Sequence, residues 1–157
     1  FIISFIFSLG SETIMPKVNL ITSIIILIIF ILLGIIFDMV GVAITTCDIK
    51  PFHSMNSKKL KYANTGIILI QNASKVSSFC NDVIGDICGI ISGSAGVIIS
   101  STISSKLNIN PLLISLIITS LIASLTIGGK AIGKQTALKN NVKIIKTFSK
   151  IASLIIK

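Results

Sequence analysis

The chain has 157 residues, of which 52% are hydrophobic and only 12% are charged. Soluble domains carry about 25% charged residues, so the composition excludes an ordinary soluble domain and indicates one integral membrane domain over residues 1–157. The net charge of +9 comes with no nucleic-acid-binding motif, so we exclude nucleic acid and assign the charge to contact with anionic lipids.

Residues 1–9 form an apolar run that is too short to span a bilayer. The run lacks the basic start and the small-residue cleavage site of a signal peptide. Because the chain begins with Phe1, a truncated fourth span that starts ahead of this residue stays an alternative. The polar break from Gly10 to Lys17 predicts a short turn.

The first full span is predicted at about 18–46. Residues 18–37 contain no charge between Lys17 and Asp38. Twenty residues at about 1.5 Å per residue cover the ~30 Å hydrocarbon core. The stretch is rich in Ile, but a strand runs only about 4–8 residues, so its length favours a helix. Asp38 then lies where the hydrocarbon is still close.

A lysine-rich polar block at 48–75 follows, and within it an apolar stripe predicts an interfacial amphipathic helix at about 57–72. The second span is predicted at about 77–105, where Gly85 and Gly89 begin a small-residue spacing that lets helices approach closely. After a loop at 106–111, the third span is predicted at about 111–129, with Pro111 in its first turn.

The tail at about 138–156 predicts a second interfacial helix with one cationic face. Five lysines lie in 48–75 and seven follow residue 129, whereas the opposite side carries only Lys17 and Lys106. The positive-inside rule therefore places 48–75 and the C-terminus in the cytoplasm. The predicted fold class is all-α, a polytopic helix bundle.

Helical projection gives each span one stripe of small or oxygen-bearing residues, and such stripes should face each other in lipid. The members are Gly34, Asp38, Gly41 and Thr45 on the first span, Ser78, Asp82, Gly85, Gly89, Gly93 and Gly96 on the second, and Ser115, Thr119, Ala123, Thr126 and Lys130 on the third.

Three of the five acidic residues lie at the cytoplasmic ends of the first two spans: Asp38, Asp82 and Asp86. Together with Asn81 they offer the hard oxygen ligands that Mg²⁺ or Na⁺ prefers. Three interpretations stay open. The acids bind a metal ion, or they mark where the helices leave the membrane, or Lys130 forms a salt bridge with Asp38 or Asp86.

No nucleophile is paired with a base, so we do not expect an enzyme. The three cysteines contain no C-x-x-C pair and fit small packing residues. His53 is the only histidine, which argues against a histidine-based zinc site.

The order of these elements resembles the transmembrane domain of the CorC/CNNM (CorB-like) magnesium transporters over about residues 30–150. FDMVGVAI at 37–44 is similar to the family's first-span motif: Ala43 matches, Gly41 stands where a glutamate is expected, and Asp38 falls near an expected serine ligand. NDVIGD at 81–86 resembles the Asn-bearing start of the family's second span.

The stretch GGKAIGKQTA at 128–137 resembles a further family motif, in which Gly129, Lys134 and Ala137 match. Gly133 replaces the family's proline, and Lys130 replaces a glutamate near the ion site. The family usually carries cytosolic regulatory domains, and we expect none within residues 1–157.

The resemblance implies a homodimeric plasma-membrane carrier for Mg²⁺, exchanged for Na⁺, with Asp38, Asn81, Asp82 and Asp86 lining a cavity that faces the cytoplasm. The alternative is a non-transporting scaffold or regulatory module. In that case the polar stripes serve helix packing and Lys130 neutralises the acids.

Overall fold

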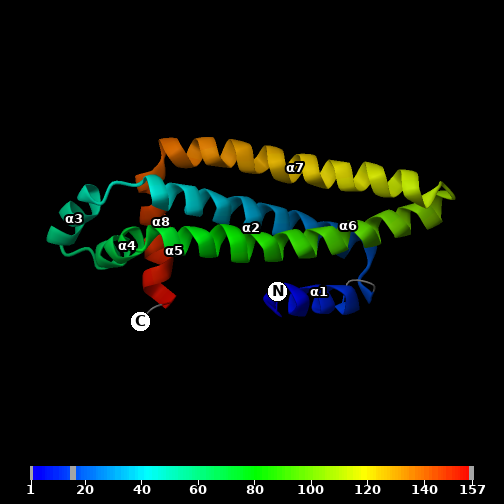
Figure 1. The fold of residues 1–157 in the computed structure, drawn as a ribbon, viewed down its shortest axis with the longest axis horizontal. Coiled ribbons are helices and arrows are strands. Elements are labelled where there is room, and N and C mark those ends of the chain that lie inside the picture. Colours follow the sequence, from blue (N-terminus) through cyan, green and yellow to red (C-terminus); the bar gives the residue numbers. More distant parts are fainter. Residues whose placement is uncertain (1, 15–16, 156–157) are drawn as a thin grey trace. The chain divides into compact units, whose positions relative to one another are not determined.

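The computed structural model describes residues 2–14 and 17–155, which form helices and short connections with no strand among them (Figure 1). The helices are α1 (Ile2–Ile14), α2 (Leu20–Thr46), α3 (Lys50–Ser57), α4 (Lys61–Gln71), α5 (Ala73–Ser78), the π-helix η2 (Phe79–Ile84), α6 (Gly85–Leu107), α7 (Pro111–Lys139) and α8 (Asn141–Ile155). The fold is all-α.

Three helices are long and apolar enough to cross a membrane within the described ranges: Leu20–Thr46, Ala73–Leu107 and Pro111–Lys139. The second of these runs through α5, η2 and α6 without a break. These helices support the assignment of the chain as a membrane protein. They also leave many large apolar side chains exposed on α2 and α7, as a lipid-facing surface requires.

Several helix bounds differ from those predicted. Residues Gly10 to Glu12 lie inside α1 rather than in a turn, because a single glycine costs a helix only about 1 kcal/mol. α7 continues past Gly129 to Lys139. The helix predicted at about 57–72 is found as α4, but it begins at Lys61, because Lys59 adopts a left-handed φ of 57° between the end of α3 and the start of α4.

Contacts between residues divide the chain into two compact units. The first unit comprises 1–35 and 84–129, and the second comprises 36–83 and 130–157. Helices α2 and α7 each have one part in the first unit and one part in the second, so the units are not successive segments of the sequence. One membrane domain over 1–157 stays a prediction.

The first unit has an apolar core formed by α2, α6 and α7. Its buried members are Leu27, Ile31, Ala95, Ile99 and Ile122. Close backbone approach occurs at Gly34 and Gly96, since a Cβ at Gly34 would lie 3.3 Å from Cys88 Cβ and a Cβ at Gly96 would lie 2.6 Å from the Ile122 side chain.

Asparagines shape the turn between α6 and α7. Asn108 ends α6 in the left-handed conformation, with a φ of 52°, that this residue type tolerates better than most. The Asn110 side-chain oxygen accepts a 3.0 Å hydrogen bond from the Leu112 N–H and caps α7. Pro111 then occupies the first helical position, where its missing N–H is not needed.

The second unit is organised around the packing of α4 on α8 and on α3. Phe52 of α3 and Ile145 of α8 are fully buried. The Phe52 ring lies directly on Gly66 of α4, where any Cβ would overlap it. Glycine at this position is therefore required for α3 and α4 to meet.

Polar contacts complete the second unit. The Asn141 side-chain amide, at the start of α8, donates a 2.9 Å hydrogen bond to the Thr46 carbonyl at the end of α2. It thereby satisfies one carbonyl that the helix end leaves open. Lys146 and Lys150 of α8 place their ammonium groups 6.0 and 5.3 Å from the centre of the Tyr62 ring, within cation–π range.

Candidate functional site

Asp38 is the one charged side chain that is buried among the residues described, with a relative exposure of 6%. It lies in the part of α2 that belongs to the second unit, and the same part carries the buried apolar residues Val40 and Ala43. Its Oδ2 atom is buried and accepts no hydrogen bond. Because burial of an uncompensated carboxylate is costly, a positive charge must lie near it.

Lys134 of α7 supplies one such charge. Its Nζ atom lies 3.8 Å from Asp38 Oδ2, which is an ion pair without a hydrogen bond. The Lys134 side chain is 53% exposed, so it reaches the carboxylate from the solvent-facing side of the unit. One of the three interpretations from the sequence assigned this role to Lys130. The structure instead pairs Asp38 with the lysine one turn further along α7.

Asn81 lies in the π-helix η2 and packs against α2 at Gly41. A Cβ at Gly41 would overlap Asn81 Oδ1, which lies directly against this glycine, and would lie only 2.9 Å from Asn81 Cγ and 3.0 Å from its Nδ2. The Asn81 amide group donates a 3.4 Å hydrogen bond to Ser77 Oγ, whereas its Oδ1 atom is buried with no donor. The sequence did not single out Ser77, although its spacing of four from Asn81 is the usual sign of such a bond.

These contacts bring two oxygen atoms without donors to one stretch of α2. Gly41, on which Asn81 packs, follows Asp38 by three residues and therefore lies on the same face, about one turn away. A buried acceptor that lacks a donor is energetically unfavourable. A carboxylate oxygen and an amide oxygen are both suitable ligands for a hard cation.

The remaining predicted ligands are placed differently. Asp82 is exposed on η2, and Asp86 is exposed in the first unit. Within the ranges 2–14 and 17–155, no three His, Cys, Asp or Glu side chains group closely enough to hold a metal ion. A metal hypothesis therefore rests on Asp38 and Asn81, with water completing the coordination.

The other predicted pathway and packing residues have local roles. The Thr45 hydroxyl is exposed and donates a 2.9 Å bond to the Val42 carbonyl, within its own helix. Gly85 is half-buried at the start of α6. A Cβ at Gly89 would meet no atom within 4 Å, so this glycine mediates no close packing among the described residues. Lys130 is half-buried in α7.

We compared the chain with protein-family models, curated proteins and solved structures, and none of them matches. The resemblance to the CorC/CNNM transmembrane domain therefore stays a prediction that rests on the residues quoted above.

Proposed function

We propose that this protein is a membrane carrier for a divalent cation, Mg²⁺, with Asp38 and Asn81 as its ion ligands. One observation carries the proposal: Asp38 Oδ2 and Asn81 Oδ1 are both buried and lack donors along one face of α2. Mg²⁺ dehydrates reluctantly and is usually held by one or two carboxylates and several waters. A site with one carboxylate and one amide suits it.

In this proposal the Lys134 ammonium group compensates the charge of Asp38 when no ion is bound. Its ammonium group already lies 3.8 Å from Asp38 Oδ2, and its half-exposed side chain is free to withdraw. An arriving cation displaces the lysine, and the departing cation lets it return. Such exchange keeps the buried carboxylate compensated at each stage. The lysine distribution further supports a cytoplasmic C-terminus. The plasma membrane and a homodimer follow from the resemblance alone.

Uptake of Mg²⁺ into proteoliposomes that contain a trapped magnesium indicator tests this proposal, with and without an opposing Na⁺ gradient. We expect Asp38→Asn to slow uptake at least about tenfold, a loss that corresponds to about 1.4 kcal/mol. Asp82→Asn is the matched control, because Asp82 is an exposed acid on η2 and the substitution removes the same charge. Equal uptake by the wild type and by Asp38→Asn would refute the assignment of Asp38 as an ion ligand.

The second candidate is a non-transporting membrane scaffold, which the Lys134–Asp38 pair itself favours. In a scaffold this pair only compensates a buried charge. Lys134→Met would then lower the thermal stability, and the added change Asp38→Asn would restore it. In a carrier the same Lys134→Met change removes a competitor, so the affinity for Mg²⁺ should rise.

A further inference from the structure

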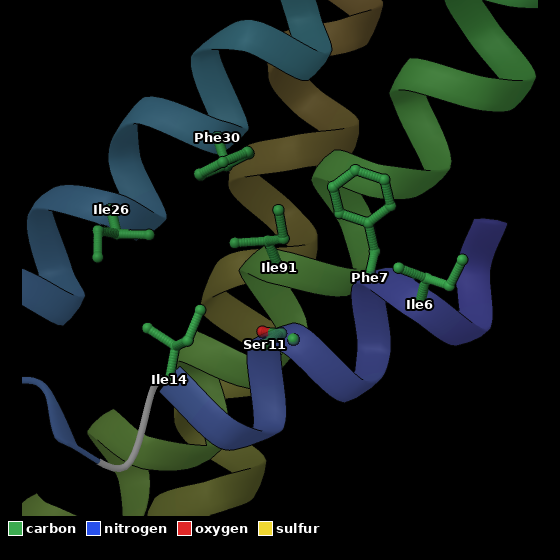
Figure 2. Close-up of a pocket in the computed structure, with 8 residues that line it drawn as sticks. Ile6, Phe7, Ser11, Ile14, Ile26, Phe30 and Ile91 are labelled. Carbon is green, nitrogen blue, oxygen red and sulfur yellow. The ribbon is translucent and has the colours of Figure 1, made fainter.

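A pocket of about 420 Å³ lies in the first unit, between α1, α2 and α6 (Figure 2). Its walls are the apolar side chains of Ile6, Phe7, Ile14, Ile26, Phe30 and Ile91. Gly10 and Ser11 of α1 complete the lining. The volume falls in the range of about 300–1,000 Å³ that holds small organic ligands. No charged side chain lines it.

The Ser11 hydroxyl is the polar group of this pocket. Ser11 is only 8% exposed, and its Oγ atom has no hydrogen-bond partner. A helical serine or threonine commonly donates to the carbonyl one turn earlier, as the neighbouring Thr13 does to Leu9 at 2.9 Å. Figure 2 shows the Ser11 side chain among the apolar side chains of the pocket wall. A ligand with an acceptor oxygen would satisfy it.

The surroundings of the pocket indicate what this ligand is. The pocket is open to the surface of the unit, and its apolar lining suits an apolar guest. α2 is one of the helices that could cross a membrane, and Ile26 and Phe30 lie about 9 and 15 Å along it from Leu20. The 27 residues of α2 extend about 40 Å, beyond the ~30 Å hydrocarbon core. The pocket is therefore at the depth where acyl chains begin.

We propose that this pocket binds one acyl chain of a membrane phospholipid, with the ester carbonyl of that chain accepting a hydrogen bond from the Ser11 hydroxyl. Along α1, Ser11 lies between Ile14 and Phe7. The carbonyl sits beside Ser11, and the hydrocarbon tail extends along the apolar lining past Phe7 and Phe30. Recognition is independent of the headgroup charge, because the lining carries none. The proposal does not depend on the ion site in the second unit.

Lipid retention by the delipidated full chain in detergent tests the proposal. The protein is incubated with dioleoyl phosphatidylcholine, separated by gel filtration and analysed for bound phospholipid by native mass spectrometry. We expect one tightly held lipid per chain. Gly10→Leu should abolish retention, because a Cβ at Gly10 meets no atom within 4 Å and the longer side chain can fill the pocket without a backbone clash. Gly93→Leu is the matched control, since Gly93 is equally unobstructed and lies outside the pocket.

An ether-linked analogue, dioleyl phosphatidylcholine, isolates the hydrogen bond because it lacks the carbonyl. The wild type should prefer the ester lipid over the ether lipid by roughly 2- to 12-fold, the worth of one hydrogen bond. Ser11→Ala, which removes a single oxygen atom, should abolish this preference and still retain the ether lipid. Phosphatidylglycerol should bind as well as phosphatidylcholine.

Three results would overturn the proposal: retention by Gly10→Leu equal to that of the Gly93→Leu control, an ester preference that persists in Ser11→Ala, or strong selection by headgroup charge. If Gly10→Leu fails to fold by circular dichroism, the comparison of ester and ether lipids decides alone.

Discussion

Replacing Gly41 by alanine perturbs the candidate ion site without changing any charge. The new methyl group would lie 2.9 Å from Asn81 Cγ and 3.0 Å from Nδ2, so Asn81 must move away from α2. Its hydrogen bond to Ser77 is already long, at 3.4 Å, and would be lost with the movement. The substitution therefore displaces the Asn81 amide oxygen, which lies directly against Gly41, from this face of α2.

Two opposing effects set the magnitude. Alanine gains about 1 kcal/mol over glycine in a helix, and insertion of a methyl group into a packed site costs about 1–3 kcal/mol. The matched control Gly89→Ala gains the first term and avoids the second, because no atom lies within 4 Å of its Cβ. We expect Gly41→Ala to be less stable than Gly89→Ala by about 1–3 kcal/mol.

Thermal unfolding of the purified protein in detergent measures this difference, at roughly 2–4 °C per kcal/mol for a chain of this size. In the proteoliposome assay, Gly41→Ala should also reduce Mg²⁺ uptake, while Gly89→Ala should retain it. If the two alanine variants unfold at the same temperature and transport equally, Asn81 neither packs on Gly41 nor contributes to an ion site.

Three further predictions concern the second unit. Gly66→Ala should lower the unfolding temperature more than Gly41→Ala does, because the Phe52 ring that the methyl group meets is fully buried and has no room to move. Tyr62→Leu should lower the free energy of unfolding by about 0.5–1 kcal/mol, and Tyr62→Phe should not, since only the aromatic ring attracts the α8 lysines. Equal unfolding temperatures for the two variants would contradict the cation–π contact. Burial, and secondarily the charge of Asp48, raise the pKa of the Cys47 thiol. Less thiolate is therefore present near pH 8, and maleimide should label Cys47 slowly. Asp48→Asn should lower that pKa and modestly increase the labelling rate, which mass spectrometry can follow.

The helical class could be predicted from the sequence for a physical reason, whereas the role of Asp38 stays a prediction. A charge-free stretch of 20 residues can satisfy its backbone hydrogen bonds in lipid only as a helix, and Asp38 is the first charged residue after this stretch. The described part of the structure contains three helices long and apolar enough to cross a membrane, which agrees with that reasoning. Transport, the ion and the assembly stay predictions.

The environment of the other acids was not accessible from sequence. A projection at a constant angle per residue assumes an unbroken α-helix, but Phe79–Ile84 is a π-helix, which changes the phase of every residue after it. The projection therefore could not tell that Asp82 and Asp86 are exposed. The choice of Lys134 over Lys130 likewise depends on how α7 packs, since both lysines lie on one face four residues apart.

The π-helix also determines where the chain tolerates a change of length. A π-helix contains hydrogen bonds from i to i+5, so removal of one residue between Phe79 and Ile84 can be absorbed by conversion to ordinary α-helical bonding. The same deletion within Leu20–Thr46 has no such reserve and would rotate all later side chains of that helix by about 100°. Natural variants of this chain that differ by one residue in length should therefore place the gap in the segment that carries Asn81.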